Sequence, residues 1–573
     1  MKIKNKLFTV IVSLSLILSI TGCNKSTNSD NQSGTTGVIV DADGNVVGGN
    51  IANENSLEQQ PQTKQQEFSG DINVDILSRH LLPSFERMEV NDRTELVDSL
   101  QVIKKIKELA LDAGNFLYPE KNLSELRITL EKITSDIPES MERVEFSGST
   151  SDEFQSFIND NIGKAINITS EKIAVTSEIN IPTDTYISGN NAEFEASSCD
   201  NVFVANSVKN VIIDSIVITG NANYGVFIAD SENITVKNSN ICGMGQKGIC
   251  VVGNSHHFCL KYNEVSRNSA GGIYCAANVS EGTIQNNIIN ENSGTSNWMA
   301  GVVLTNVNSQ NPMNIWETFD TVHHFPVKVN LYSQVNCPHN IVIENNEISE
   351  NNASGIYSDG SYNCYVINND VIDNDKEGIC LDYGTIGFYL NKNLFEKNGR
   401  RIRQSDDDLK MDFVFDAGRM DDGSAKSKLP GVSIDNAAYN ILENNTVVNN
   451  YGGGIKMVRT GIRNLIMENI VKDNNQGQND AYHFFGIELG SALADVEATD
   501  MDFTPDFENI ICRNVISGNH YSGVFIGEDG YVNDIFDNIV IGPQMFAIEA
   551  ISSKFNSIIN NFSNADIRNE YKG

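Results

Sequence analysis

From about residue 150 onward, short apolar runs recur roughly every 24 residues and alternate with polar positions at a period of two. The runs are rich in β-branched residues, Pro is scarce, and the pattern is typical of short β-strands. One asparagine, followed two positions later by an apolar residue, keeps this spacing at positions 263, 287, 346, 369, 393, 445, 469, 514 and 538. A repeat with about three short strands buries its apolar face only by stacking on its neighbours. We therefore predict stacked coils in which these asparagines bond to one another along a tight bend.

The first third of the chain has a different pattern. Residues 23–69 are rich in Ser, Asn, Gln, Thr and Gly, which predicts a solvated tether. Residues 70–145 change to a helical period, which predicts a small helical module. Its two helices are marked by apolar residues that share one face, namely Leu96, Leu100, Ile103, Ile106 and Leu109 for the first and Leu123, Leu126, Leu130 and Ile133 for the second.

The first 22 residues have the character of a bacterial signal peptide. Three lysines precede a 14-residue apolar stretch from Leu7 to Ile20, which is too short to span a membrane. The phrase "SITGC" that follows resembles a lipobox, with cleavage before Cys23 and lipid on its thiol. We therefore expect a protein held on the extracellular face of the cell membrane by this lipid anchor alone. An ordinary secretory signal is the alternative.

The charge of the chain excludes some partners. The net charge is −34, and removal of residues 1–22 leaves 38 basic against 75 acidic residues, a net charge of −37. Such a charge argues against binding to nucleic acid or to anionic membrane surfaces. Nine cysteines besides Cys23 are scattered without any CxxC pair, so we expect buried free thiols and neither a zinc site nor a disulfide scaffold.

The repeats and the segment that opens them carry a resemblance to a known family. The stretch "DEFQSFINDNIGKAINITSEKIAVTSEINIPTDTYISG", residues 152–189, resembles the capping helix and first strands of the pectate lyase superfamily. This resemblance implies an all-β fold, a right-handed single-stranded parallel β-helix of about a dozen coils over residues 150–565. It specifies no activity, because such helices host lyases, hydrolases, epimerases and adhesins. Insertions near 306–340, 396–430 and 490–508 interrupt the period and predict loops around a binding face.

An aspartate returns to one position of the repeat in three consecutive coils. The phrases are "GIYSDGS", "GICLDYG" and "GVSIDNA", and the aspartates, each four residues after the Gly, are Asp359, Asp382 and Asp435. Alternation along a strand directs positions two and four residues after the Gly outward. Lys456 and Glu488 occupy the second position in the next two coils, with Arg459 just beyond the strand. We therefore predict one cluster of acidic and basic groups on adjacent coils.

This cluster allows three functional interpretations. Carboxylates on strands about 4.8 Å apart need a cation or a shared proton between them. In the first interpretation Asp359, Asp382 and Asp435 bind calcium. The protein is then a polysaccharide lyase that acts on a uronate-containing glycan, with Lys456 as base, Arg459 neutralising the substrate charge, and Asp382 and Glu488 completing the catalytic set.

The second interpretation is a glycoside hydrolase that uses two of Asp359, Asp382, Asp435 and Glu488. The third is a non-catalytic glycan-binding or adhesive surface protein, in which the aspartates are turn residues. The Gly-His-Gly motif of the superfamily's polygalacturonate hydrolases is missing. Of these interpretations we favour the lyase, and we expect a monomer that acts on a polysaccharide substrate.

Overall fold

The computed structural model divides into two compact units, residues Met1–Val97 and Asp98–Gly573. In the first unit it describes only the strands β1 (Ile39–Val40) and β2 (Val46–Val47), which pair antiparallel. In the second unit it describes residues 119–570 except 198, 295, 307–315, 320–326, 331–336, 383, 401–428, 436, 459–460, 462, 477–484, 491–505, 508, 519, 528–529, 532, 544 and 552–555. The predicted signal peptide, Cys23 and residues 70–118 of the predicted helical module lie outside the described residues.

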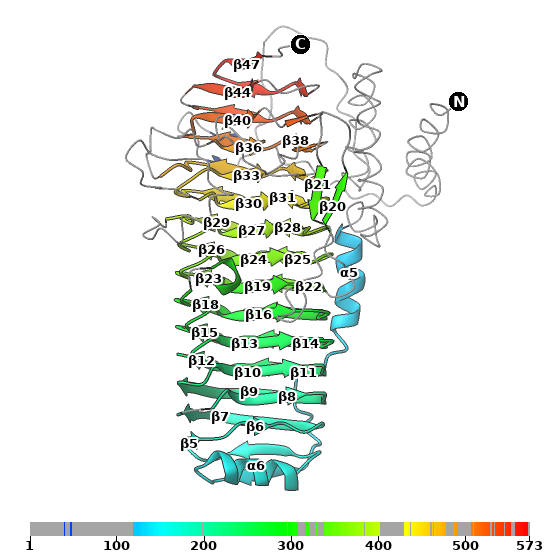
Figure 1. The fold of residues 1–573 in the computed structure, drawn as a ribbon, viewed down its shortest axis with the longest axis vertical. Coiled ribbons are helices and arrows are strands. Elements are labelled where there is room, and N and C mark those ends of the chain that lie inside the picture. The colour runs from blue at the N-terminus through cyan, green and yellow to red at the C-terminus, as the bar shows by residue number, and fades with distance from the viewer. Residues whose placement is uncertain are drawn as a thin grey trace, which may run out of the picture. The chain divides into compact units, whose positions relative to one another are not determined.

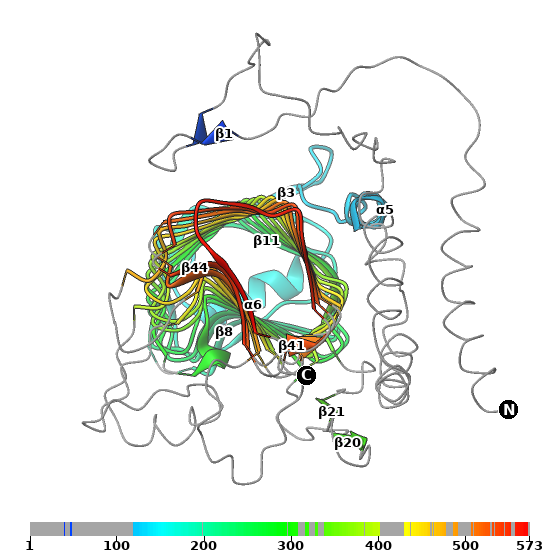
Figure 2. The ribbon, with the colours of Figure 1, turned by 90° about the horizontal axis from the view of Figure 1, so that it is seen from above.

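The second unit is a right-handed parallel β-helix of about 13 turns, which confirms the predicted fold (Figure 1). Each turn adds one strand to each of three faces, and the chain passes from face one to face two to face three before it starts the next turn. Figure 2 looks along the stack and shows the turns superimposed around a common interior.

Face one is a single parallel sheet of fourteen strands, namely β6 (Ile179–Asn180), β8 (Asn201–Asn206), β10 (Tyr224–Ala229), β13 (Lys247–Val252), β16 (Ile273–Ala276), β19 (Val302–Thr305), β24 (Ile356–Asp359), β27 (Ile379–Asp382), β30 (Val432–Asp435), β33 (Ile455–Val458), β36 (Ile487–Leu489), β40 (Ser522–Ile526), β44 (Phe546–Ile551) and β47 (Ile567–Glu570). Face two contains β3 (Arg143–Phe146), β4 (Ala165–Ile168), the first halves of β7 (Thr185–Ala196) and β9 (Lys209–Gly220), β11 (Glu232–Lys237), β14 (His256–Lys261), β17 (Ser280–Gln285), β22 (His339–Glu344), β25 (Tyr365–Ile367), β28 (Tyr389–Asn391), β31 (Ile441–Glu443), β34 (Leu465–Met467), β38 (Ile510–Cys512), β42 (Asp534–Phe536) and β45 (Ser557–Ile559).

Face three contains β5 (Lys172–Val175), the second halves of β7 and β9, β12 (Asn240–Cys242), β15 (Glu264–Ser266), β18 (Ile288–Asn290), β23 (Glu347–Ser349), β26 (Asp370–Ile372), β29 (Leu394–Glu396), β32 (Thr446–Val448), β35 (Ile470–Lys472), β39 (Val515–Ser517), β43 (Ile539–Ile541) and β46 (Phe562–Ser563). The solenoid therefore begins at β3, ahead of residue 150 where we expected it, because Arg143–Phe146 already pairs in parallel with β4.

The remaining elements are short. They are the helices α5 (Pro119–Leu130) and α6 (Ser151–Asp160), the 3₁₀ turn η1 (Asn297–Met299), the antiparallel pair β20 (Trp316–Phe319) and β21 (Val327–Asn330), and the parallel pair β37 (Asp506–Phe507) and β41 (Gly530–Tyr531). None of the helices in the described part of the chain is both long and apolar enough to cross a membrane. Most of the three predicted insertions lies outside the described residues.

The interior of the solenoid is filled by one side of every strand. On face one, Ile379 and Leu381 of β27 are fully buried in the main apolar cluster, whereas Cys380 and Asp382 alternate with them on the outer side. The nine cysteines after Cys23 are free thiols, and seven of them are buried, as expected. Because the interior is a continuous column of Ile, Val, Leu and Phe, each turn is stabilised by the turns above and below it.

Three ladders of buried asparagines run along the corners of the solenoid. The predicted ladder is confirmed, since each Asn from Asn263 to Asn538 donates its backbone N–H and its side-chain Nδ2 to Oδ1 of the next, and the ladder ends at Asn561. The second ladder consists of Asn268, Asn292, Asn351, Asn374, Asn398, Asn450 and Asn474. The third consists of Asn440, Asn464, Asn509, Asn533 and Asn556.

The ladder asparagines hold the bends but do not themselves adopt the left-handed conformation. Wherever the residue before a ladder asparagine is described, it has that conformation, for example Asn368 (φ 52°) before Asn369 and Lys392 (φ 57°) before Asn393. A left-handed non-glycine residue costs about 1–2 kcal/mol. The buried amide that follows offsets this cost, because its donors and its acceptor are all bonded to the adjacent turns.

The helix α6 closes the first turn of the stack, as the sequence predicts (Figure 2). Thr150 and Glu153 form a capping box at its start, so the backbone N–H groups of these two residues are satisfied. Its buried side chains, Phe154 and Ile158, cover the open end of the apolar interior. The cap therefore keeps the first turn from exposing the core to water.

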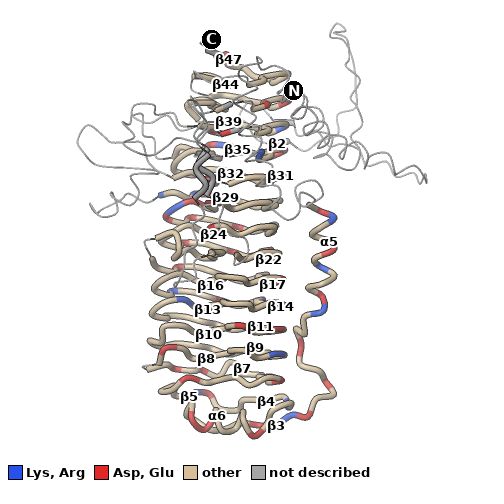
Figure 3. Tube along the Cα trace, turned by 45° about the vertical axis from the view of Figure 1, so that its right-hand side comes forward, with Lys and Arg blue, Asp and Glu red and all other residues tan. Residues whose placement is uncertain are grey.

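The helix α5 and the segment after it lie along the outside of face two (Figures 1 and 3). Arg127 forms an ion pair with Glu344, and Asp136 pairs with the buried Lys237. The backbone N–H of Thr134 donates to Asn233 Oδ1 at 2.8 Å. These contacts fasten this outer segment to the solenoid over several turns.

The second ladder ends on a histidine, which predicts a pH dependence of stability. Asn474 Nδ2 lies 3.1 Å from His520 Nε2, and burial lowers the pKa of His520 to about 3. In the unfolded chain the pKa is about 6.5, so below that pH the unfolded state binds a proton that the folded state does not. As the pH falls from 6.5 to 3, His520 therefore lowers the free energy of unfolding by about 1.4 kcal/mol for each pH unit.

We expect His520→Asn, which continues the ladder with its usual residue, to remove this contribution. Denaturant unfolding at pH 7 and pH 5 should show the wild type losing about 2 kcal/mol more than the variant. Equal losses in the two chains would contradict the neutral, buried state of His520.

Candidate functional site

The register of face one brings the three predicted aspartates together. Asp359 of β24 pairs with Asp382 of β27, and the pairing of Leu381 with Ile434 sets Asp435 of β30 next to Asp382. Adjacent strands lie about 4.8 Å apart. All three side chains face away from the apolar interior, as alternation predicts. They form one file across three consecutive turns, which we call the aspartate file.

The aspartate file is buried although it lies on the outer side of the sheet. The exposed fractions of Asp359, Asp382 and Asp435 are 2%, 1% and 1%. Buried carboxylates are retained in proteins when they are hydrogen-bonded, paired with a charge or bound to a metal. The burial favours a role in holding a ligand or in positioning other groups, rather than direct contact with a long polymer.

Asp359 is the first member of the file and is strongly perturbed by burial. Its Oδ2 accepts hydrogen bonds from Trp298 Nε1 at 3.3 Å and from Thr305 Oγ1 at 3.4 Å. Its Oδ1 is buried and has no hydrogen-bond partner among the described residues. Burial raises the pKa of Asp359 to about 7, and the two hydrogen bonds oppose this rise. Asp359 therefore has one oxygen that a proton, a cation or a ligand would satisfy.

Asp382 lies at the centre of the file and is positioned by a tyrosine. Tyr357 Oη donates to Asp382 Oδ2 at 3.2 Å, from the outer position of the preceding turn. Both residues are buried, so this hydrogen bond fixes the carboxylate where water is excluded. The turn residue Thr385 donates to the backbone carbonyl of Asp382 at 2.7 Å, which fixes the end of the strand.

The predicted base and its acidic neighbour occupy the adjacent file of the same sheet. Lys456 of β33 pairs in register with Ser433 on one side and Glu488 of β36 on the other. Lys456 Nζ lies 3.7 Å from Glu488 Oε2, and their side chains are 30% and 9% exposed. Lys456 is thus the accessible member of the cluster. Arg459 lies outside the described residues.

Two residues beside the aspartate file, Trp298 and Lys247, were not predicted from the sequence. Trp298 belongs to η1, and its backbone carbonyl accepts from Lys247 Nζ while its indole donates to Asp359. Burial lowers the pKa of Lys247 to about 8. Lys247 Nζ also lies 5.1 Å from the centre of the Tyr274 ring. Thr305 occupies the same file position as the aspartates one turn earlier, a signal that the spacing does carry.

The aspartate file fits a hard cation such as calcium. Such ions prefer several oxygen ligands, and the file offers three carboxylates in register, of which one oxygen, Asp359 Oδ1, is buried and unbonded within the described part of the chain. The residues that would hold the ion are Asp359, Asp382 and Asp435.

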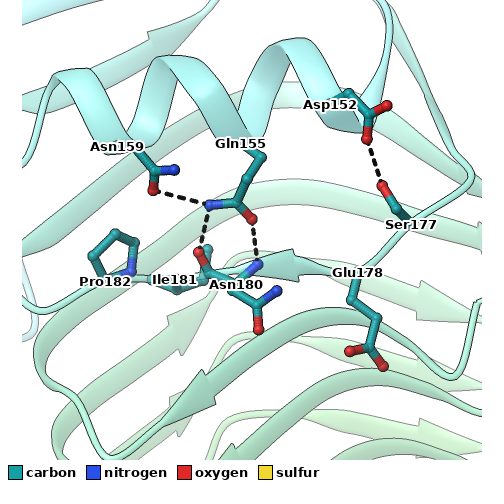
Figure 4. A pocket seen from close by; sticks show the side chains of 8 residues that line it. All are labelled: Asp152, Gln155, Asn159, Ser177, Glu178, Asn180, Ile181 and Pro182. Carbon is teal, nitrogen blue, oxygen red and sulfur yellow. Dashed lines mark hydrogen bonds between the residues drawn. The ribbon is translucent and has the colours of Figure 1, made fainter.

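A cavity of about 500 Å³ lies elsewhere, where α6 meets the first turns (Figure 4). Gln155 Nε2 donates to the carbonyl of Asn180 and its Oε1 accepts from the N–H of Asn180. Asp152 accepts from Ser177 at 2.7 Å. The polar groups of this cavity satisfy one another and close the strand edge, so we assign it to the cap rather than to the functional site.

Comparisons with known proteins agree with the fold. The family model described as "Right handed beta helix region" matches residues 177–315, and the one described as "Periplasmic copper-binding protein (NosD)" matches residues 296–483. No curated protein sequence matches this chain.

Three solved structures illustrate what the fold is similar to. The A-module of the mannuronan C-5 epimerase AlgE4 of Azotobacter vinelandii has 12% identity over 75% of this chain and 99% of its own, with a TM-score of 0.42. The surface adhesin PfbA of Streptococcus pneumoniae has 11% identity over 70% and 88%, with a TM-score of 0.39. The catalytic unit of a GH87 α-1,3-glucanase of Streptomyces thermodiastaticus has 10% identity over 76% and 70%, with a TM-score of 0.38. Similarities of this level carry no argument about activity.

The burial of Asp359 predicts a stability effect that does not depend on substrate. Because its pKa is about 7 in the folded state and near 3.9 when unfolded, the wild type loses stability as the pH rises from 4 to 7 and carries the full penalty at pH 8. In chelator at pH 8, Asp359→Asn should therefore melt at the same or a higher temperature than the wild type. The control Asp370→Asn removes an exposed carboxylate on the neighbouring β26 and should change the free energy of unfolding by at most about 0.5 kcal/mol. A clear loss of stability in Asp359→Asn alone would show that the charged form is paired.

Proposed function

We propose that this right-handed parallel β-helix protein acts on polysaccharide, and that it is a lyase that cleaves a uronate-containing glycan by β-elimination. The observation that carries the proposal is the register of face one, which sets the buried aspartate file beside the partly exposed Lys456 and its buried partner Glu488. The fold is one that accommodates polysaccharide-active proteins, and the cluster supplies both an acid and a base at one place.

The chemistry begins with removal of the proton α to the uronate carboxylate. In the resting protein Glu488 favours the ammonium form of Lys456. When substrate covers the pair and excludes water, transfer of a proton from Lys456 Nζ to Glu488 leaves a neutral amine. This amine takes the α proton, the electron pair forms the carbon–carbon double bond, and the bond to the β oxygen breaks. Protonated Glu488 donates to the departing oxygen, which restores the ion pair.

The aspartate file supports this reaction from the next file of the sheet. A calcium ion held by Asp359, Asp382 and Asp435 would supply positive charge against the substrate carboxylate. Arg459, which follows β33, is proposed to add to this neutralisation. The catalytic set of the proposal therefore comprises Lys456 and Glu488 for proton transfer, with Asp382 and Arg459 arranging the charge around them.

A glycoside hydrolase is the second candidate, and one observation favours it. Asp359, whose pKa burial raises to about 7, lies in register with Asp382, and a carboxyl group with a raised pKa beside a second carboxyl group suits acid–base hydrolysis of a glycosidic bond. The burial of both side chains counts against direct contact with a sugar. A non-catalytic adhesive protein is the remaining alternative.

We propose that the protein works outside the cytoplasm. The signal-like start of the sequence supports this location, as does the match to a family described as periplasmic. The lipid at Cys23 remains part of the proposal. A polysaccharide substrate needs no cytoplasmic cofactor. Because the net charge of −34 disfavours an anionic chain, the proposed calcium ion and Arg459 are the groups that would supply local positive charge for it.

Digestion of a polysaccharide panel separates the three candidates, and two variants test the proton transfer. We expect products with ultraviolet-absorbing unsaturated ends, and a fall in turnover of about 10²–10⁴-fold in Lys456→Ala, because general base catalysis contributes about that much. Glu488→Gln should also lower turnover while leaving binding intact. The control Lys472→Ala changes a lysine of face three and should keep wild-type turnover.

New reducing ends without unsaturation would replace the lyase by the hydrolase. Binding to a glycan of the panel without any product would establish the adhesive alternative. Wild-type turnover in Lys456→Ala would remove Lys456 from the mechanism.

Calcium should stabilise the folded protein, because a ligand that binds only the folded state raises the free energy of unfolding by about 2.7 kcal/mol at 100 times its dissociation constant. Melting curves with calcium and with chelator should show this rise in the wild type and a smaller one in Asp382→Asn. Lys456→Ala should keep the full calcium response, which separates the ion site from the base. An unchanged melting temperature in wild type would contradict the calcium site while leaving the roles of Lys456 and Glu488 to the digestion assay.

A further inference from the structure

Face two carries a second cluster of chemically capable groups, four turns before the coil of Asp382. Glu232 of β11 and His256 and His257 of β14 place one ligand atom each within 4.8 Å of one another. Each of the three is partly exposed. The two imidazole Nδ1 atoms lie 2.7 Å apart, and the rings meet at 73°. We call these three residues the histidine cluster.

Two successive residues of a strand ordinarily point to opposite sides of the sheet. His256 and His257 share one side because His257 has a left-handed backbone conformation, with φ 55°. The strand pairing reflects this, since His256 pairs with Glu232 and Phe258 pairs with Ile234, while His257 lies outside the ladder of pairs. The backbone thus turns the second imidazole toward the first.

The left-handed position recurs in every turn around the histidine cluster, and its usual occupant is a short polar residue. Its occupants between residues 184 and 363 are Asp184, Asn210, Asn233, His257, Glu281, Asn340 and Asn363. Aspartate and asparagine are the residues that tolerate this conformation well. The two departures, His257 and Glu281, are neighbours and contact each other, with Nε2 and Oε2 3.1 Å apart. The fold does not require either residue at this position.

The contact with Glu281 favours one tautomer of a neutral His257. A neutral imidazole that donates from Nε2 to a carboxylate presents an unprotonated Nδ1. This Nδ1 faces the histidine cluster, where it lies 2.7 Å from His256 Nδ1. Imidazoles that bind metals use the same arrangement, with the far nitrogen bonded to an outer carboxylate.

We propose that the histidine cluster binds a divalent transition-metal ion of the zinc or copper(II) type. The ligands are His256 Nδ1, His257 Nδ1 and a carboxylate oxygen of Glu232. Glu281 is the outer carboxylate, which bonds His257, and water fills the open positions of the ion. Two imidazoles and one carboxylate form a ligand set that such ions prefer over calcium or magnesium. On binding, the proton shared by the two Nδ1 atoms moves to Nε2 of His256, so both imidazoles stay neutral and both Nδ1 lone pairs face the ion.

The required rearrangement is small. Two nitrogens at about 2.0–2.1 Å from a tetrahedral ion are about 3.3 Å apart, so the rings must separate by roughly 0.6 Å. Lys209 forms an ion pair with Glu232 and is 63% exposed, so it can move into solvent when the ion takes its place. The cluster lies outside residues 296–483, which match the periplasmic copper-binding family, so that match does not carry the proposal.

Calorimetric titration of the full chain with Zn²⁺ tests the site, and Cu²⁺ with electron paramagnetic resonance reports the number of bound imidazoles. We expect one ion that shows coupling to two nitrogens. His257→Asn restores the usual residue of the left-handed position, so the fold is preserved while one ligand is lost, and the affinity should fall at least 100-fold. Glu281→Gln should weaken binding about 10–100-fold, as loss of an outer partner does.

The matched control is His339→Gln, which changes a histidine of the same face, in line with His256 and two turns further along. It should keep wild-type affinity, and circular dichroism should be unchanged in every variant. No binding by the wild type would leave only a hydrogen-bonded histidine pair and overturn the proposal. Equal affinity in His257→Asn would place the ion elsewhere and overturn it as well.

Discussion

The hydrogen bond between stacked asparagines is the interaction on which the rest of the structure depends. A ladder amide such as Asn393 is buried, accepts two bonds from Asn369 in the turn before it, and donates to Asn445 in the turn after it and to the carbonyl of Val366. These bonds hold a left-handed residue at the corner, where a non-glycine backbone is otherwise strained. A turn that slipped by one residue would bury an unbonded amide at each corner and turn its apolar residues outward. The ladders therefore fix the register of every turn against its neighbours.

Fixed register turns a repeating sequence into files of side chains. On face one, the position four residues after the repeat glycine runs through Thr305, Asp359 and Asp382 without a break. Aspartates at this position in adjacent turns therefore lie side by side, even though their carboxylates repel each other when both are charged. Hydrogen-bond donors beside the file offset this repulsion, since Tyr357 donates to Asp382 and Trp298 donates to Asp359. Oδ1 of Asp359 receives no such hydrogen bond from the described residues.

The sequence was sufficient to predict the parts of the fold that follow from the repeat. The first asparagine ladder, the capping helix and the file of aspartates were predicted because spacing and alternation determine them. The second and third ladders were not predicted, although Asn268, Asn292 and Asn351 have the same spacing along the chain as the first series.

The parts that depend on departures from the repeat could not be predicted. Trp298 reaches Asp359 from η1, a turn that lies between β18 and β19 and has no counterpart in the neighbouring coils. The burial of the aspartates likewise depends on what covers the sheet and cannot be deduced from alternation. His256 and His257 share a side only because of the backbone conformation at 257, which a strict period of two does not allow.

These departures give a physical criterion for function in a solenoid. The fold sets a preferred residue type for every file, so a residue of that type carries no functional information. An aspartate in a file that elsewhere holds Val252, Ala276 and Thr305 adds a desolvation cost that the fold does not need. A histidine and a glutamate at a left-handed position that suits asparagine add strain in the same way. Both departures occur in consecutive turns, so that the substituted side chains contact one another. In both the aspartate file and the histidine cluster such costs recur in adjacent turns and bring complementary groups together, and this shared property is the physical basis of both proposals.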